Sequence, residues 1–118
     1  MPKRDSLHHQ PPESVHRLLC AAINNKRLIE FHYKECRRIA EPHDYGVIDG
    51  MKKLLAYQVE GESQSGRLPA WRWAEVDGIN RVRVLQEKFA GARPVSSGSH
   101  IKWDCRYASV SVPGKDPC

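Results

Sequence analysis

Several features that would assign a function directly are missing from this 118-residue sequence. No apolar run approaches the roughly 20 residues that a membrane-spanning helix needs. The N-terminal stretch MPKRDSLHHQPP begins with basic residues, but no apolar segment follows it, so it does not match a secretory signal. These absences predict a cytoplasmic protein with no membrane partner.

The cysteines lack the short spacing of a metal site. A structural zinc site usually takes two ligands from one turn of the chain. The four cysteines are far apart: Cys20, Cys36, Cys105 and Cys118. Without secretion, a disulfide framework is not expected either. The sequence therefore predicts four ordinary thiols, no metal site and no cofactor.

Motifs of catalysis are also missing. The chain has no nucleophile elbow, no H-E-x-x-H motif, no paired-carboxylate motif and no phosphate loop. His32 and the His43-Asp44 pair are of catalytic residue types, but nothing beyond residue type supports that role. His43 follows Pro42 directly, which favours a side chain that fixes a bend through a backbone hydrogen bond. We therefore predict that the protein is not an enzyme and has no catalytic residue.

The charge of the chain is modestly basic. The formal net charge is +5, acidic residues are interspersed throughout, and no run of Lys and Arg is longer than two. A basic balance favours polyanionic partners. A solvated, mildly basic surface without such a partner is the alternative.

A helix is expected directly after an N-terminal tail. Residues 1–11 show no periodicity and are predicted to be disordered. Apolar residues then recur with the spacing of one helical stripe, namely Val15, Leu18, Leu19, Ala22 and Ile23. Pro12 suits the first turn and Asn24-Asn25 a stop. A helix of about 12 residues is marginal alone, so its stripe must cover another element.

Strand patterns follow the helix. Apolar and polar residues alternate in RLIEFHY, MKKLLAYQVE, RLPAWRWAEV and INRVRVL. Pro42 favours a bend or an edge position in the segment RRIAEPHDYGVI. The dipeptides Asp49-Gly50 and Asp77-Gly78 predict two hairpin turns.

Successive short strands without intervening helices predict antiparallel pairing, and a small sheet protects its edges best by closing on itself. The expected fold is mainly β with one N-terminal helix, a small antiparallel β-barrel plus an extra C-terminal strand. This last strand carries Ile101, Trp103, Cys105 and Tyr107 on one face. The predicted boundaries are a tail at 1–11, a barrel domain with its leading helix at 12–90, a linker and C-terminal strand at 91–112, and a tail at 113–118.

Several ordered motifs resemble one known family. The stretch from about residue 17 to 89 carries LIEFHY, RRIAEP, LLAYQV and WRW, and it resembles the WYL domain. It is similar in particular to short stand-alone bacterial WYL-like proteins, which carry strings such as EPHDYGVIDG, AYQVEGESQSG and GARP. The Trp-Tyr-Leu tripeptide itself is absent, and Lys53-Leu54-Leu55 stands about where it would fall.

The resemblance implies an SH3-like, Sm-type barrel with a regulatory, ligand-sensing role. Longer relatives place this domain after a winged helix-turn-helix, and nucleotides or single-stranded DNA are their suggested ligands. Only about 26 residues precede the first predicted strand here, too few for a helix-turn-helix unit. We therefore expect the chain to act alone, as a homodimer, or beside a separate regulatory protein.

Nine residues combine the chemistry that binds a phosphate or a base. Arginine binds phosphate bidentately, and aromatic rings stack on bases. The loop from Gly61 to Gly66 could present backbone N–H groups and hydroxyls to an anion. The candidate ligand-binding residues are Arg38, His43, Tyr45, Tyr57, Gln58, Ser63, Ser65, Trp71 and Arg72.

Structural roles compete with binding at each position. Trp71 and Trp73 share a face opposite Arg72, and at least one of them is expected in the core. Tyr57 has the parity of core residues, whereas Gln58 is predicted on a half-buried face where its amide needs a partner. Arg72 could instead form an ion pair with Glu41 or Glu75, and the two glycines of the loop could simply serve a turn.

Two classes of function therefore remain. One is a non-catalytic domain that binds a nucleotide or single-stranded nucleic acid, and the other is a protein-interaction or oligomerisation module. The basic residues discriminate between them. Convergence on one groove beside an exposed aromatic residue favours nucleic acid, and dispersion favours the interaction module; the test set is Arg37, Arg38, Arg72, Arg81 and Arg83.

Overall fold

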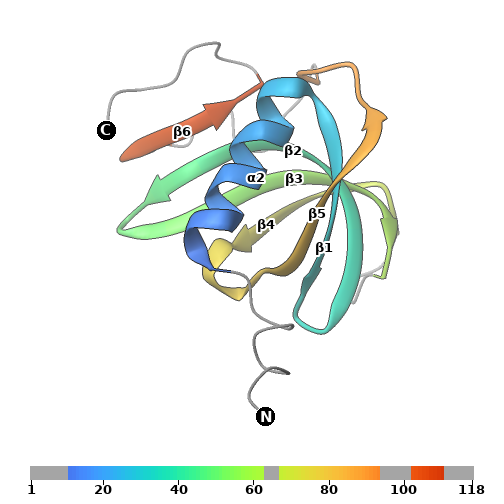
Figure 1. Cartoon of the computed structure of the whole chain (residues 1–118), viewed down its shortest axis with the longest axis horizontal. Coiled ribbons are helices and arrows are strands. Elements are labelled where there is room, and N and C mark those ends of the chain that lie inside the picture. Colours follow the sequence, from blue (N-terminus) through green and yellow to red (C-terminus); the bar gives the residue numbers. More distant parts are fainter. Residues whose placement is uncertain (1–10, 63–66, 94–101, 111–118) are drawn as a thin grey trace.

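A computed structural model of the chain describes residues 11–62, 67–93 and 102–110. One helix precedes six strands, and it lies across one face of a strongly curved sheet (Figure 1). The elements are α2 (Pro12–Asn25), β1 (Arg27–Tyr33), β2 (Cys36–Ile48), β3 (Met51–Gly61), β4 (Ala70–Glu75), the 3-10 turn η1 (Val76–Gly78), β5 (Asn80–Lys88) and β6 (Cys105–Ser109).

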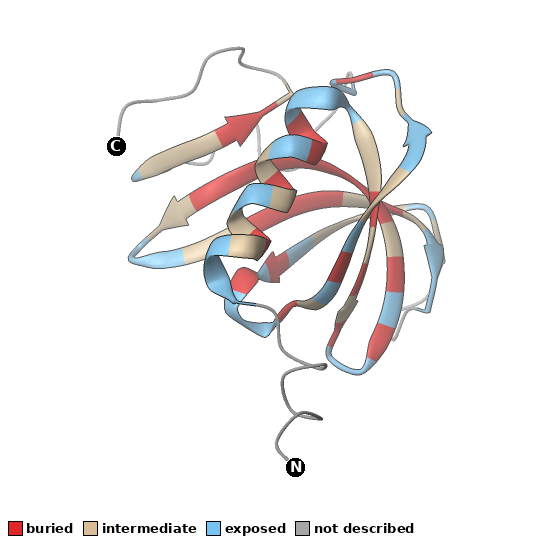
Figure 2. Ribbon diagram, in the orientation of Figure 1, coloured by how far each residue is buried: buried red, intermediate tan, exposed pale blue. Residues whose placement is uncertain are grey.

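The helix forms as its apolar stripe predicts. Val15, Leu19, Ala22 and Ile23 are buried, and Leu18 packs partly buried against the same core. The helix ends at Lys26, which adopts the left-handed conformation (φ 56°) and donates its N–H to the carbonyl of Ile23. The stripe packs against β1, β2, β5 and β6. Figure 2 shows the buried side of α2 turned toward the sheet.

The sheet is antiparallel with the order β4-β3-β2-β1-β5. The first half of β2, Cys36 to Ala40, pairs with β1, and Asp44 to Val47 pair with β6 along the same edge. Pro42 lies between these two stretches, where its missing N–H leaves no ladder bond to lose. The predicted bend at Pro42 and the predicted C-terminal strand are both confirmed; Ile101 lies outside the described residues.

The mainly β class with one N-terminal helix is confirmed, but the sheet is not closed into a barrel. Within the described ranges, β4 and β5 do not pair with each other. The chain leaves β4 through η1 and continues as β5 beside β1, so the two edges stay apart. Tyr33 of β1 spans the interior instead, and its hydroxyl accepts a hydrogen bond from the backbone N–H of Glu75 at 3.1 Å.

The two Asp-Gly dipeptides behave differently. Asp49 (φ 51°) and Gly50 (φ 80°) turn the chain between β2 and β3, which confirms the first predicted hairpin turn. Asp77 and Gly78 belong to η1, so the second prediction is wrong. A Cβ atom at Gly78 would lie 3.2 Å from the ring of Tyr33, so this glycine allows the tyrosine to cross the interior.

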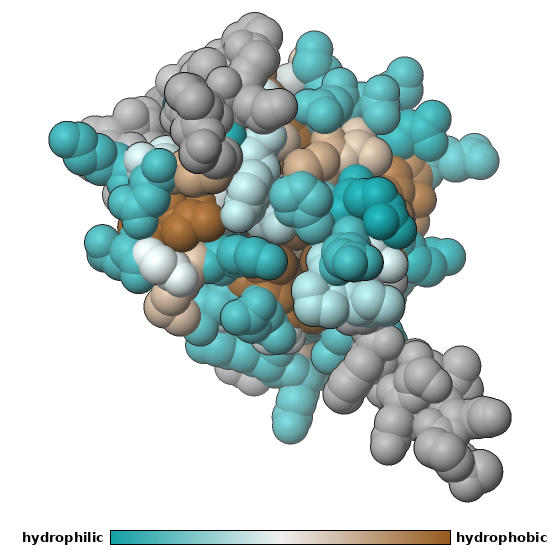
Figure 3. Space-filling model, turned by 60° about the vertical axis from the view of Figure 1, so that its left-hand side comes forward, coloured by the Kyte–Doolittle hydropathy of each residue, from teal (hydrophilic) through white to brown (hydrophobic). Residues whose placement is uncertain are grey.

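Side-chain alternation divides the sheet into an inner and an outer face. The inner face packs against α2 and includes Ile29, Phe31, Ala40 and Leu54. The outer face carries Glu41, Leu55 and Tyr57 on β2 and β3. On the side of the molecule shown in Figure 3, hydrophilic side chains cover most of the surface and hydrophobic ones form small separate patches.

One cysteine differs from the prediction. Cys20 and Cys36 are not in disulfides, but Cys105 is disulfide-bonded, so the prediction of four ordinary thiols is wrong. Disulfides persist mainly in oxidising compartments. No helix in the described part of the chain is long and apolar enough to cross a membrane. The cytoplasmic location stays a prediction, and Cys105 does not support it.

Candidate functional site

The nine predicted site residues do not form one site. Three lie on the inner face, three lie on the outer face, one lies in the core, and two are outside the described residues. Those on the inner face are Arg38, Gln58 and Arg72, and those on the outer face are His43, Tyr57 and Trp71. Tyr45 lies in the core, and Ser63 and Ser65 lie outside the described residues.

Strand register brings Arg38, Gln58 and Arg72 together as an inner-face cluster. Gln58 pairs with Ala40 on β2 and with Ala70 on β4, and Arg72 pairs with the next inner residue of β3, Ala56. Arg38 is one inner position beyond Ala40. The three polar side chains therefore follow a diagonal across β2, β3 and β4, the part of the sheet where β3 leads into the loop to β4.

Arg38 is buried without a carboxylate partner. It is 7% exposed, its guanidinium carbon lies 5.3 Å from the centroid of the Tyr33 ring, and its Nε has no hydrogen-bond partner. No described carboxylate forms an ion pair with it. Residues 63–66, which follow Glu62 in the sequence and lie outside the described residues, read Ser-Gln-Ser-Gly and contain no acidic side chain.

The side-chain amide of Gln58 has hydrogen-bond partners for its nitrogen but not for its oxygen. It is 1% exposed, and its Nε2 donates to the carbonyls of Glu60 and Glu62 at 3.1 and 2.9 Å. These two bonds fix the orientation of the amide and bring it beside Gly61, the register partner of Arg38. Its Oε1 is buried without a partner. The inner-face cluster thus offers one unused donor and one unused acceptor.

Tyr45 is part of the core. It is fully buried, and its hydroxyl lies 2.9 Å from Nδ1 of His16 on α2. Burial raises the pKa of Tyr45 well above its usual range. Burial also lowers the pKa of His16, and the nearby charges of Lys52 and Arg17 lower it further. The ring of Tyr45 has no surface accessible to a ligand in this structure, and its role in binding stays a prediction.

The outer face carries a row of directly paired side chains. Glu41 pairs with Tyr57, and Tyr57 pairs with Trp71, so the three lie side by side across β2, β3 and β4. The Tyr57 and Trp71 rings meet edge to face, with centroids 5.1 Å apart. Trp71 is half-buried and Trp73 is 37% exposed, so the expectation that one of them lies fully in the core is wrong. The expected core position of Tyr57 is also wrong, because its parity places it on the outer face.

A residue that the sequence did not single out completes this row. Arg93, five residues beyond β5, donates two hydrogen bonds to Glu41, from Nε to Oε1 at 2.9 Å and from Nη2 to Oε2 at 2.6 Å. Its guanidinium carbon lies 3.9 Å from the centroid of the Tyr57 ring. A usable signal was the acidic residue in the run Ala40-Glu41-Pro42 of β2, since a buried carboxylate requires a basic partner.

His43 contacts Glu41 rather than the backbone. Its Nε2 lies 3.0 Å from Oε1 of Glu41, and its ring packs against Trp71 and Phe89. The predicted backbone bond from its side chain is therefore wrong. Burial lowers the pKa of His43 more than the hydrogen bond to Glu41 raises it. For Glu41, burial raises the pKa, but the bonds from Arg93 and His43 outweigh it and hold the pKa below its usual value.

The basic residues are dispersed over the sheet. Arg37 and Arg83 both form ion pairs with Glu30, the latter at 2.8 Å. The hydrogen bond from Arg37 is the main cause of the lowered pKa of Glu30. Arg38 and Arg72 lie on the opposite face, and Arg81 is exposed on β5. The five arginines therefore do not converge on one groove.

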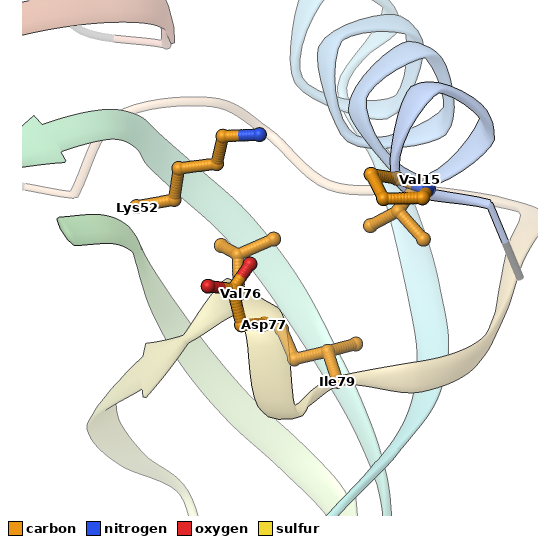
Figure 4. Close-up of a pocket in the computed structure, with 6 residues that line it drawn as sticks. Val15, Lys52, Val76, Asp77 and Ile79 are labelled. Carbon is orange, nitrogen blue, oxygen red and sulfur yellow. The ribbon is translucent and has the colours of Figure 1, made fainter. Parts of the chain in front are cut away.

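Two hollows lie at the start of α2. One is a cavity of about 70 Å³ between the helix and η1 (Figure 4), lined by Pro12, Val15, Lys52, Val76, Asp77 and Ile79. This volume is well below the roughly 300–1,000 Å³ of ligand pockets. The other is a shallow groove lined by Pro12, Glu13, His16, Arg17 and Lys52. No described group of three or more His, Cys, Asp or Glu residues could hold a metal ion.

No family model, curated protein or solved structure matches the chain. The resemblance to the WYL domain therefore stays a prediction, and function rests on the residues themselves.

Proposed function

We propose that the protein is a non-catalytic ligand-binding domain whose inner-face cluster binds a nucleotide or a short single-stranded nucleic acid. The observation that carries this proposal is the buried guanidinium of Arg38, which has no described carboxylate partner. Removing a charged side chain from water costs several kcal/mol unless a counter-charge compensates it. A bound anion supplies that counter-charge.

The unused atoms of the cluster define what a ligand must offer. Arg38 Nε needs an acceptor, and Gln58 Oε1 needs a donor. A nucleotide carries both, because its phosphate oxygens accept and its base or ribose donates. A sulfate ion satisfies only the arginine, because it has no donor at neutral pH. The half-buried Arg72 on the same face adds a second positive charge.

A short ligand fits better than a long strand. A protein that tracks a nucleic acid backbone needs a continuous basic path. Here Arg37 and Arg83 share the carboxylate of Glu30 on the outer face, and of the five arginines compared only Arg38 and Arg72 lie on the inner face. Dispersion of the arginines favours the alternative function, a protein-interaction module, over binding of an extended nucleic acid.

The proposal is tested by titrating mononucleotides and a short single-stranded oligonucleotide into the whole chain, with calorimetry as the readout. We expect wild-type binding and its loss in Arg38→Met and in Gln58→Leu. Arg17→Ala is the matched control, because it removes the same charge beside the shallow groove at the start of α2. Loss in Arg17→Ala with binding intact in Arg38→Met moves the site to that groove. No binding by the wild type in low salt rejects the proposal and leaves the interaction module.

A further inference from the structure

The outer face holds a second, independent binding geometry. We name the group Glu41, His43, Tyr57 and Trp71 the outer-face pocket. Two of its members hold the guanidinium of Arg93, which binds both oxygens of Glu41 and stacks on Tyr57 at 3.9 Å. A carboxylate that accepts two parallel N–H groups beside an aromatic face suits a guanidinium, and an ammonium cannot satisfy both requirements in one geometry.

Strand pairing sets the positions of the residues in the outer-face pocket. Ladder pairing fixes Glu41 beside Tyr57 and Tyr57 beside Trp71. Trp71 also packs against His43 with ring centroids 4.9 Å apart, and His43 bonds Glu41 from the other side. Glu41 is 6% exposed and His43 is 2% exposed. A side chain so placed on rigid strands is preorganised for a cationic partner.

The segment that carries Arg93 is less firmly held than the strands of the outer-face pocket. Arg93 follows β5 in a stretch without helix or strand, and its side chain is 38% exposed. This stretch is tied to the domain by the N–H of Phe89, which donates to the carbonyl of Lys26 at 2.9 Å, and by the ring of Phe89 against His43. Arg93 can therefore leave by a local movement, and the buried carboxylate that it exposes would need another cation.

We propose that the outer-face pocket is a guanidinium-binding site, occupied in cis by Arg93, that accepts an arginine side chain of a partner protein when Arg93 leaves. Trp73 lies two residues from Trp71 on the same face of β4 and is 37% exposed. It offers an apolar contact to the residue beside the incoming arginine. An attached competitor acts at an effective concentration of about millimolar, so the partner must supply contacts beyond its arginine.

Chemical complementation tests the site on the whole chain. Arg93→Ala empties the pocket, and N-acetyl-arginine amide is then titrated while binding is followed by NMR shifts of the His43 and Trp71 rings. We expect saturable binding to Arg93→Ala and loss of binding in Arg93→Ala/Glu41→Gln. Wild type should bind more weakly, on the order of tenfold or more, because its pocket is free only in the fraction of molecules from which Arg93 has left.

Two controls define the specificity. N-acetyl-lysine amide should not replace the arginine probe, and Arg83→Ala should gain no site, since Arg37 still pairs with Glu30 in that variant. Arg93→Gln keeps most of the stem and serves in place of Arg93→Ala if the latter does not fold. Absence of binding to the emptied pocket, or binding that persists without Glu41, would overturn the proposal and leave the Arg93–Glu41 pair as a structural tie.

Discussion

Arg38 and Arg93 are arginines in opposite circumstances. Arg38 is buried on the inner face without a described carboxylate, whereas Arg93 is part-exposed on the outer face and holds both oxygens of a buried one. The inner face therefore has a cation without an anion among the residues that the structure describes. The outer face has an anion that already has its cation. A ligand for the inner face must therefore bring an anion, whereas a ligand for the outer face must bring a cation that displaces Arg93.

Loss of the packing between α2 and the sheet should have the largest effect, because it should unfold the domain and with it both faces of the sheet. Leu19 is fully buried in the stripe that covers the inner face. Leu19→Asp introduces an unpaired carboxylate there and should lower the free energy of unfolding by about 3 kcal/mol or more. Urea unfolding followed by circular dichroism measures this. A stable variant that merely changes from dimer to monomer in size-exclusion chromatography would show that the stripe forms a dimer seam instead.

Removing Arg93 from the outer-face pocket should cause the next largest loss in the free energy of unfolding. Arg93→Ala leaves the carboxylate of Glu41 buried with only His43 beside it. We expect a loss of about 2 kcal/mol, less than for a fully buried pair because Arg93 is part-exposed. Arg83→Ala is the control and should cost less than about 0.5 kcal/mol, since Arg83 is 68% exposed. Equal losses in the two variants would remove the distinction between the pocket and a surface ion pair.

Acidification should weaken the outer face in two steps. The pKa of His43 is lowered from 6.5 on folding, so the unfolded chain takes up its proton first, and stability should begin to fall as the pH drops below about 6.5. His16 contributes with the same sign. The pKa of Glu41 is lowered from 4.5, so its contribution is lost below that value. Urea unfolding from pH 8 down to about pH 2.5 should show both steps, and His43→Gln should reduce the first one.

The smallest expected change has the opposite sign. Arg38→Met replaces a buried cation that has no described counter-charge with an apolar side chain of similar length. Stability should stay unchanged or rise by about 1 kcal/mol while nucleotide binding is lost. Thermal unfolding with and without nucleotide measures both quantities. A destabilised Arg38→Met variant would indicate that the chain itself satisfies Arg38.

Sequence periodicity predicted the helix and the strands more reliably than it predicted which side chains would be buried. The stripe from Val15 to Ile23 and the alternation of the strands are local patterns, and both are confirmed. Alternation also placed Trp71 and Trp73 opposite Arg72. It could not say which face would be covered. Phe89 and Arg93 cover part of the outer face from a segment without periodicity, so the apolar parity of Tyr57 does not distinguish this covered face from the core.

Tertiary contacts decided the remaining differences. Asp49-Gly50 and Asp77-Gly78 are the same dipeptide, but only the first forms a hairpin turn, because Gly78 lies against Tyr33 in η1. The register shift between Pro42 and Asp44 leaves His43 as the bulged residue. Pro42 marks the place of this bulge, but the contacts of the His43 ring with Trp71 and Phe89 join residues far apart in the sequence, which no local pattern predicts.

Two different strands pair with the same edge of β2 and shield its backbone amides from solvent. Its first half is covered by β1 and its second half by β6, with Pro42 at the boundary. Amide hydrogens of Cys36 to Ala40 that face β1 can exchange with solvent only when the central sheet opens. Those of Asp44 to Val47 that face β6 need only the release of a five-residue strand. Hydrogen exchange should therefore divide β2 into a slow and a fast half, so that a single continuous strand belongs to two cooperative units.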